Sequence, residues 1–308
     1  MALLKARGLW KNFGEVQAVA GIDLEIDPGE IFGLVGPDGA GKTTTLRLLV
    51  GVLDPERGDV EVDGVRVDSS PEEARERLGY MPQQYSLYGD LTVAENLAFF
   101  ADMYFVPKAE RKERLARLYR FSRLESYANR PAGKLSGGMY KKLALSCNMI
   151  HGPKVLLLDE PTTGVDPLSR RELWDILYAF AAEGVAIVVC TPYMDEAERC
   201  HRVGLMAGGR FLAMDRPQAI LEDYPEAIFE AFVSEIRAAR AALRTVRGVL
   251  RSYPSGQALK IACAPGTDPA VLGRALAEAG LPAVSLERVR PSFEDVFLSR
   301  QSTTEQRQ

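Results

Sequence analysis

Alternating and wholly apolar segments in the first third of the chain predict strands. Ile22, Leu24 and Ile26 alternate with polar residues, which predicts a strand with one buried face. The apolar run 31–35 predicts a strand buried on both faces. Valines flank Asp63-Gly64, a dipeptide that accepts the positive φ of a tight turn, so a hairpin is expected there.

The middle of the chain shows helical spacing and then alternates between strands and helices. Apolar residues recur on one face of 92–105 and 108–123, and another helix is expected to begin near Ser136. After it we expect a buried strand, a helix, a second strand and a short helix: 155–158, 167–183, 185–191 and 194–200. This alternation is typical of an α/β fold with a parallel sheet covered by helices.

The character of the sequence changes near residue 216. The segment beyond it reads as strand, helix, strand, strand, helix, strand, helix, which predicts a small α+β domain. We therefore divide the chain into domains 1–220 and 221–308, with a helical subdomain at about 84–150. The second domain contains no motif that indicates chemistry, so dimerisation and regulation both stay open as its role.

Composition narrows the class of protein. The chain has 308 residues, 46% hydrophobic and 26% charged, and a net charge of −4, which favours a globular protein and argues against a nucleic-acid binder. Four irregularly spaced cysteines indicate reduced thiols in the cytoplasm. No segment approaches the ~20 apolar residues that span a bilayer, and the N-terminus does not resemble a signal peptide. Any role at a membrane is therefore expected to depend on a partner.

A glycine-rich segment lies between the buried strand at 31–35 and a predicted helix. It fits the phosphate-binding pattern G-x-x-x-x-G-K-[ST] with Gly36, Pro37, Asp38, Gly39, Ala40, Gly41, Lys42 and Thr43. Glycines let backbone N–H groups surround phosphate oxygens, and the helix N-terminus favours an anion. Lys42 is expected to neutralise the β- and γ-phosphates and Thr43 to bind Mg²⁺, with Thr44 completing the predicted nucleotide-binding set. A loop that merely turns a corner is the alternative.

Two carboxylates follow the apolar strand at 155–158. Parallel sheets place ligands at the carboxyl ends of their strands, so Asp159 is expected to hold Mg²⁺, directly or through water. Glu160 is then placed to polarise a water in line with the γ-phosphate. The alternative is an ordinary strand end whose acids cap the next element.

Several further segments carry a family resemblance that covers about residues 3–215. One segment resembles the signature of ABC-transporter ATPases: Leu135, Ser136, Gly137, Gly138 and Met139. Gln83 resembles the Q-loop residue, Asp166 the D-loop residue, and Phe13 the aromatic residue that stacks on adenine. The segment 290–298 looks like the tail of drug- and antibiotic-efflux members, which pair with a separate membrane permease.

The resemblance implies a P-loop NTPase of the ABC ATPase type, with an antiparallel β subdomain and a helical subdomain. It implies ATP and Mg²⁺ as ligands, with Gln83 bridging Mg²⁺ or water. Two nucleotide-binding domains, identical or different, enclose two ATP molecules head to tail. Ser136 and the N–H groups of Gly137 and Gly138 then contact the γ-phosphate held by the other subunit.

The sequence departs from the family pattern at two places. Met139 replaces the usual glutamine, a change that several efflux ATPases tolerate. Pro192 stands where the family has its switch histidine, and proline offers neither a polar side chain nor an N–H. Because His201 lies too far along the chain to replace it, and His151 is expected to be structural, the hydrolytic site lacks one donor. Slow or conditional hydrolysis is therefore expected.

The sequence leads to one main hypothesis and two alternatives. The main one is the ATPase subunit of an exporter, bound through its permease to the cytoplasmic face of the membrane. The second is a degenerate partner that clamps ATP with little hydrolysis. The third, a soluble family member acting on nucleic acid or ribosomes, is disfavoured because the chain has one nucleotide domain and no room for a long coiled coil before the signature. The transported substrate cannot be read from this chain.

Two surfaces are candidates for outside contacts. Tyr85, Leu87 and Tyr88, with part of 99–105, are expected to be exposed to the permease. The segment 108–123 is strongly basic, which predicts either a solvated face or contact with lipid headgroups. Its cations are Lys108, Arg111, Lys112, Arg114, Arg117, Arg120 and Arg123.

Overall fold

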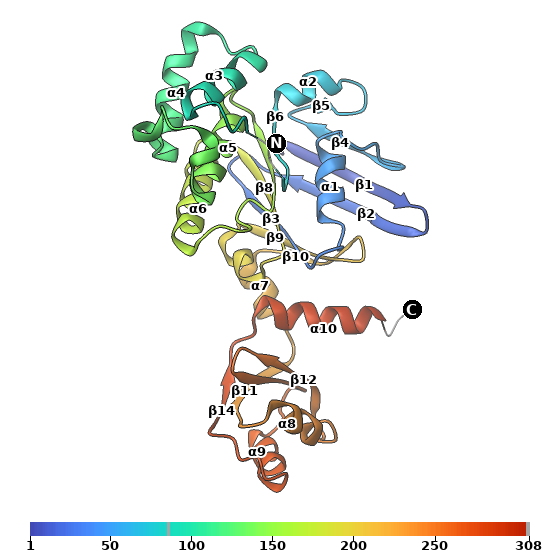
Figure 1. Ribbon diagram of the computed structural model, residues 1–308. Helices are drawn as coiled ribbons and strands as arrows, with labels where there is room; N and C mark the ends of the chain where they lie inside the picture. The colour runs from blue at the N-terminus through green and yellow to red at the C-terminus, as the bar shows by residue number, and fades with distance from the viewer. Residues whose placement is uncertain (85–86, 306–308) are drawn as a thin grey trace. The chain divides into compact units, whose positions relative to one another are not determined.

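The computed structural model describes residues 1–84 and 87–305, with side chains as far as Gln301. The chain forms two compact units, Met1–Pro217 and Gln218–Gln308 (Figure 1). Tyr85 lies outside the described residues.

An antiparallel sheet begins the first unit. Its strand order is β2-β1-β4-β5, with bounds Leu4–Phe13 for β1, Val16–Ile26 for β2, Arg57–Val62 for β4 and Val65–Arg66 for β5. Ile22, Leu24 and Ile26 of β2 are buried, as their alternation predicted. The hairpin at Asp63-Gly64 is also confirmed, because β4 pairs antiparallel with β5 across it.

A six-stranded sheet forms the centre of the first unit. Its order is β10-β9-β3-β8-β7-β6, with bounds Ile31–Val35 for β3, Leu78–Met81 for β6, Val155–Asp159 for β7, Ala186–Thr191 for β8, Arg202–Ala207 for β9 and Arg210–Asp215 for β10. All neighbours pair in parallel except β9 and β10. Every residue of β3, β7 and β8 is buried, so the predicted parallel sheet with two covered faces is confirmed.

Helices pack against this sheet, and α3, α4 and α5 form the helical subdomain drawn in teal to green in Figure 1. The α-helices are α1 (Lys42–Leu49), α2 (Pro71–Glu76), α3 (Val93–Met103), α4 (Lys108–Ser122), α5 (Gly137–Met149) and α6 (Pro167–Ala182). The 3₁₀ helices are η1 (Glu125–Tyr127), η2 (Ala132–Lys134) and η3 (Met194–Arg199). The short helix expected at 194–200 is thus of the 3₁₀ type, and its last turn closes with an i to i+3 bond from Cys200 to Ala197.

The second unit has the element order that the sequence predicted, and the expected α+β class is confirmed. After α7 (Pro217–Glu222), at the junction, its elements are β11 (Ala227–Phe232), α8 (Ile236–Leu243), β12 (Val249–Ser255), β13 (Ala258–Cys263), α9 (Pro269–Glu278), β14 (Ser285–Val289) and α10 (Phe293–Glu305). The antiparallel sheet has the order β12-β13-β11-β14, which is the split βαβ arrangement. Apolar residues of α8, α9 and the sheet form its core.

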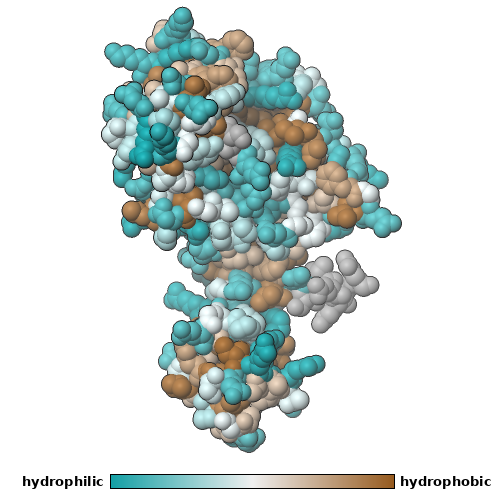
Figure 2. Space-filling view, in the orientation of Figure 1, coloured by the Kyte–Doolittle hydropathy of each residue, from teal (hydrophilic) through white to brown (hydrophobic). Residues whose placement is uncertain are grey.

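The surface and the thiols agree with a globular protein. Among the described residues, no helix is both long enough and apolar enough to cross a bilayer. On the face that Figure 2 shows, hydrophilic and hydrophobic residues are interspersed over each unit. All four cysteines are free and buried, in agreement with the expected reduced thiols.

Candidate functional site

The glycine-rich loop joins the buried strand β3 to helix α1. Gly41 stands at the N-cap of α1 with φ of 105°, in the left-handed region that favours glycine. A Cβ at Gly36 would lie 2.2 Å from the Met206 carbonyl oxygen, and one at Gly41 would lie 2.2 Å from that of Ala18. The backbone can therefore take this path only with glycine at both positions, and the path directs the N-terminus of α1 toward the loop.

A pocket of about 690 Å³ opens over this loop. We call it the P-loop pocket, and it is lined by Val16, Gln17, Ala18, Asp38, Gly39, Gly41, Lys42, Thr43, Thr44, Gln83, Glu160, Thr163, Pro192 and Tyr193. Lys42 is buried, and its ammonium donates to the carbonyl oxygens of Gly36 (2.7 Å) and Pro37 (2.9 Å). The pocket thus combines one lysine with the N-terminus of a helix, which is an arrangement that binds phosphate.

Glu160 is held in an unusual conformation at the edge of the pocket. Its φ is 50°, although it is not glycine, and its backbone N–H donates to the Cys190 carbonyl at 2.9 Å. Its Oε2 accepts from Gln83 Nε2 at 2.9 Å and from Thr163 Oγ1 at 3.0 Å. Backbone strain of this kind persists only where the surroundings fix it, and it concentrates at functional sites.

Asp159 lies beneath the loop at the end of β7. Its Oδ1 accepts from Thr43 Oγ1 at 3.1 Å, and its Oδ2 is buried with no hydrogen-bond partner among the described residues. Burial raises the pKa of Asp159, the Thr43 hydroxyl opposes that rise, and the neighbouring Glu160 adds to it. A buried carboxylate oxygen without a partner beside a hydroxyl is a donor set that suits Mg²⁺, so these two residues fit the metal.

The structure brings together only some of the residues predicted for the site. The P-loop pocket is lined by Asp38, Gly39, Gly41, Lys42, Thr43, Thr44, Gln83, Glu160 and Pro192 from that set. Phe13 is half exposed and does not line it. Gly36, Pro37 and Ala40 belong to the loop but not to the lining, and Asp159 does not line the pocket but accepts a hydrogen bond from Thr43, which does.

Sequence reasoning missed five lining residues: Val16, Gln17, Ala18, Thr163 and Tyr193. The first three lie at the start of β2, which comes near the loop only through folding. Thr163 lies three positions after the predicted residue Glu160, and Tyr193 directly follows Pro192. Both residues follow the carboxyl ends of strands β7 and β8. This position could have identified them from the sequence, because ligands bind at the carboxyl ends of parallel strands.

The signature and D-loop residues lie outside the pocket. Ser136 is the N-cap of α5, and its hydroxyl accepts from the Met139 N–H at 3.3 Å. A Cβ at Gly138 would lie 2.3 Å from Ser169 Oγ, so α6 packs closely against this turn. Asp166 is the N-cap of α6, where hydrogen bonds from Ser169 lower the pKa of its carboxyl. Within one chain, Ser136 and Asp166 therefore act as helix N-caps.

Neither histidine lines the pocket. His201 Nδ1 accepts from the Ile31 N–H at 2.8 Å, which joins the start of β9 to β3. His151 stacks on Tyr104 with ring centroids 4.0 Å apart, and its Nε2 lies 3.0 Å from the Leu78 carbonyl oxygen. Both imidazoles therefore have structural contacts away from the loop.

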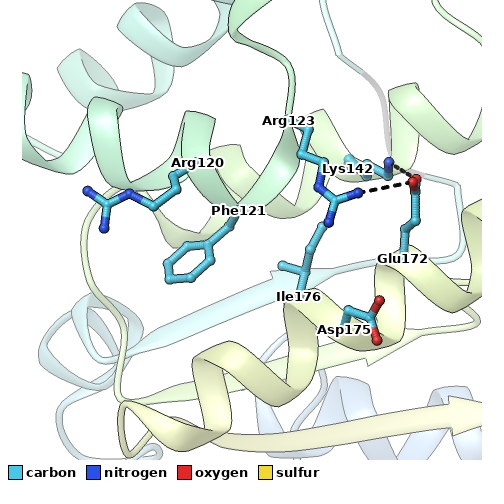
Figure 3. Close-up of a pocket in the computed structure, with 7 residues that line it drawn as sticks. All are labelled: Arg120, Phe121, Arg123, Lys142, Glu172, Asp175 and Ile176. Atoms are coloured by element: carbon cyan, nitrogen blue, oxygen red, sulfur yellow. Dashed lines mark hydrogen bonds and ion pairs between the residues drawn. The ribbon is translucent and has the colours of Figure 1, made fainter.

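A smaller cavity of about 160 Å³ lies among α4, α5 and α6 (Figure 3). Lys142 and Arg123 both pair with Glu172 there, the latter at 3.6 Å. Two of its cations are thus compensated from within the fold, and it contains none of the predicted site residues. It carries no part of the nucleotide chemistry.

The fold and the P-loop pocket define a P-loop NTPase. A family model described as ABC transporter matches residues 19–163. The chain is 40% identical over 302 residues to "Probable multidrug ABC transporter ATP-binding protein YbhF" of Escherichia coli, covering 96% of this chain and 52% of that protein. It is 40% identical to "Nod factor export ATP-binding protein I" of Ralstonia nicotianae, covering 71% of this chain and 68% of the relative.

Solved structures give the same result. One ATP-binding subunit of an ABC transporter is 31% identical, with a TM-score of 0.65, over 71% of this chain and 92% of that one. A dimeric bacterial ABC transporter cassette is 26% identical, with a TM-score of 0.62, over 69% of this chain and 98% of that one. The chain therefore belongs to the ABC transporter ATP-binding family, as the resemblance implied. It spans about half the length of YbhF.

Proposed function

We propose that the chain is the ATP-binding and ATP-hydrolysing subunit of an exporter, acting through a separate membrane permease. The P-loop pocket carries this proposal, because it joins the phosphate-binding lysine to the buried Glu160 through one continuous lining. Membership of the ABC family implies ATP hydrolysis, and the relatives named for multidrug transport and Nod factor export support an export role. Binding to this permease would hold the subunit at the cytoplasmic face of the membrane.

Each of these residues has a separate role in the proposed hydrolysis of ATP. When a nucleotide binds, the Lys42 ammonium gives up its hydrogen bonds to the loop carbonyls and contacts the β- and γ-phosphates instead. Thr43 and Asp159 would hold Mg²⁺, which neutralises charge between the phosphates when it is bound. Glu160 accepts a proton from the attacking water, while Gln83 and Thr163 hold its carboxylate in position.

Closure of a dimer completes the site. Ser136, Gly137 and Gly138 lie outside the P-loop pocket of their own chain, so they are free to reach a nucleotide held by a second domain. The dimeric cassette among the solved structures supports this arrangement. ATP binding then drives closure because these contacts form only in the closed state.

A patch on the helical subdomain is the proposed contact with the permease. We call it the α3 patch: Tyr88, Phe99, Met103 and Phe105, all exposed. Tyr88 and Phe99 pack edge to face with centroids 4.6 Å apart, and Phe105 is 90% exposed. Leu87 does not belong to it. The expectation that Leu87 is exposed is wrong, because its side chain is buried; its backbone N–H donates to Tyr140 Oη at 2.7 Å.

Contact between α4 and lipid headgroups receives little support. Within the described residues, four of the seven cations in 108–123 form ion pairs: Arg111 with Asp102, Arg114 with Glu110, Arg117 with Glu183 and Arg123 with Glu172. Cations that are compensated within the fold offer little free charge to an anionic surface. The solvated-face interpretation is therefore preferred.

The test of hydrolysis uses Glu160→Gln in the full chain. The amide cannot accept a proton, so we expect ATP turnover to fall by about 10²–10⁴-fold while ATP binding persists and dimers accumulate. Turnover and size-exclusion chromatography with MgATP measure both effects. Turnover at the unaltered rate would contradict the assignment of Glu160.

Pro192 supports the second candidate, a subunit that clamps ATP with little hydrolysis. It lines the P-loop pocket but brings no donor there. We expect Pro192→His to raise turnover by up to ~10²-fold with ATP affinity similar, whereas Pro192→Ala, which adds no donor, leaves turnover low. Equal rates in the two variants would show that this position does not limit hydrolysis.

A further inference from the structure

An arginine-lined pocket of about 570 Å³ lies within the second unit, apart from the nucleotide chemistry. Its lining comes from α8 and the residue after it, from β12 and from α10: Arg237, Arg240, Ala241, Arg244, Arg251, Ser252, Tyr253 and Leu298. We call it the arginine pocket. Every lining residue belongs to Gln218–Gln308, so the pocket depends on this unit alone.

The spacing of the arginines on α8 follows from how the helix packs. Ala239 and Leu243 are buried in the core of the unit. Arg237, Arg240 and Arg244 recur at intervals of three and four residues, so they share the opposite, exposed face. The stretch 236–251 contains no acidic residue, although it contains five arginines.

These positive charges are poorly compensated within the fold. Across the described part of the chain, Arg237 and Arg244 form no ion pair, and Arg240 donates from its Nε to the Ser252 carbonyl at 3.0 Å. Like charges three and four residues apart on a helix destabilise it. The cavity of Figure 3 differs in this respect, because Glu172 there pairs with both Lys142 and Arg123.

The back of the arginine pocket is fixed in place. Arg251 pairs with Glu226 and also donates to Tyr224 Oη at 3.2 Å. Tyr253 donates its hydroxyl to Asp295, which is fully buried and also paired with Lys260 at 3.0 Å. The two nearby carboxylates are therefore occupied, and the tyrosine ring is held rigidly against the hollow.

We propose that the arginine pocket binds the phosphate of a small phosphate ester whose apolar or aromatic part lies against Tyr253 and Ala241. Guanidinium groups match phosphate oxygens with paired N–H donors, and the rigid ring offers a surface for stacking. An anion placed among the arginines also relieves their mutual repulsion. A free phosphate ester and the headgroup of an anionic lipid share this chemistry.

The test measures binding to the full chain carrying Lys42→Ala, so that the P-loop pocket does not bind the probe. Isothermal titration uses 1-naphthyl phosphate as the probe. Two half-probes serve as comparisons: 1-naphthol, which lacks the phosphate, and inorganic phosphate, which lacks the aromatic ring. Vesicles of phosphatidylcholine with and without phosphatidic acid test the lipid source. We expect saturable binding to 1-naphthyl phosphate or to the acidic vesicles, weakened by salt, and weaker binding to each half-probe. No saturable binding to either would overturn the proposal.

Matched variants locate the binding. We expect Arg237→Gln with Arg244→Gln to weaken binding by about tenfold or more, because two charged contacts are lost. Arg247→Gln with Arg274→Gln makes the same change of charge at exposed positions outside the pocket and should leave affinity unaltered. Equal weakening by both pairs would mean nonspecific attraction and would overturn the proposal.

A second pair of variants tests the proposed site even if the arginine substitutions impair the folding of the second unit. Ala241 is exposed on α8, between the arginines. Ala241→Glu places a carboxylate in the hollow and should abolish binding while raising the thermal stability of the unit. Ala241→Gln has the same shape without the charge and should retain most of the binding. Equal affinity in these two variants would contradict the proposed site. Since ATP binding plays no part in any of these measurements, their outcome is independent of the proposed function.

Discussion

At the scale of single residues, the site depends on how Glu160 is held. Its positive φ aims the carboxylate at Gln83 and Thr163, and both donate to the same oxygen, Oε2. The other oxygen is left to accept a hydrogen bond from a water. The sequence predicted the carboxylate from its place after an apolar strand, but no pattern predicted the hydrogen bond from Thr163.

Thr163 is expected to position Glu160. We expect Thr163→Val to lower kcat by about tenfold with KM little altered, because one hydrogen bond to the carboxylate is lost and the nucleotide contacts remain. Steady-state ATP turnover measures both parameters. Thr163→Ser keeps the hydroxyl and should retain most of the activity, so a loss of equal size in both variants would assign Thr163 a packing role instead.

The thiols provide a second prediction at this scale. All four are buried, and burial raises the pKa of each thiol, that of Cys263 to about 11. Since the thiolate is the reactive form, we expect a colorimetric thiol reagent at mildly alkaline pH to leave the folded protein unmodified. The denatured protein should react at four sites. Rapid reaction of the folded protein would mean that a thiol is accessible.

At the scale of elements, strands and helices with a clear hydrophobic periodicity were predicted from the sequence, and those with a weak periodicity were not. The buried strands at 31–35 and 155–158 and the helices near 92–105 and 108–123 were predicted because their periodicity is clear. Strand β1 was not predicted, because irregularities in its pairing with β2 interrupt its alternation. Strand β6, of four residues, was also not predicted.

Helix α3 depends on its first turn. The Thr92 hydroxyl accepts from the Glu95 N–H at 3.2 Å, and the Glu95 carboxylate accepts from the Thr92 N–H at 2.8 Å, which is a capping box. We expect Thr92→Ala to cost about 1 kcal/mol and to lower Tm by roughly 2–4 °C. Fluorescence of Trp10 and Trp174 reports unfolding of the first unit. Thr92→Ser keeps the hydroxyl, so a Tm as low as that of the alanine variant would rule out the cap as the cause.

At the scale of the whole molecule, each of the two compact units contains its own pocket. Every residue that lines the P-loop pocket lies in Met1–Pro217. The motifs predicted the loop and its acids, but the pocket also draws on β2, whose approach depends on long-range folding. No motif marked the second unit, because arginines spaced along a short helix resemble an ordinary solvated face until the structure shows the hollow beside them.

This division makes a prediction about a shortened chain. A fragment that ends at Pro217 retains the whole lining of the P-loop pocket, so we expect it to bind MgATP with the affinity of the full chain. Lys42→Ala in the same fragment removes the cation proposed to bind the phosphates and should weaken binding by about tenfold or more. Isothermal titration of the folded fragment, checked by circular dichroism, measures both. If the folded fragment bound ATP much more weakly than the full chain, residues beyond Pro217 would have to contribute to the nucleotide site.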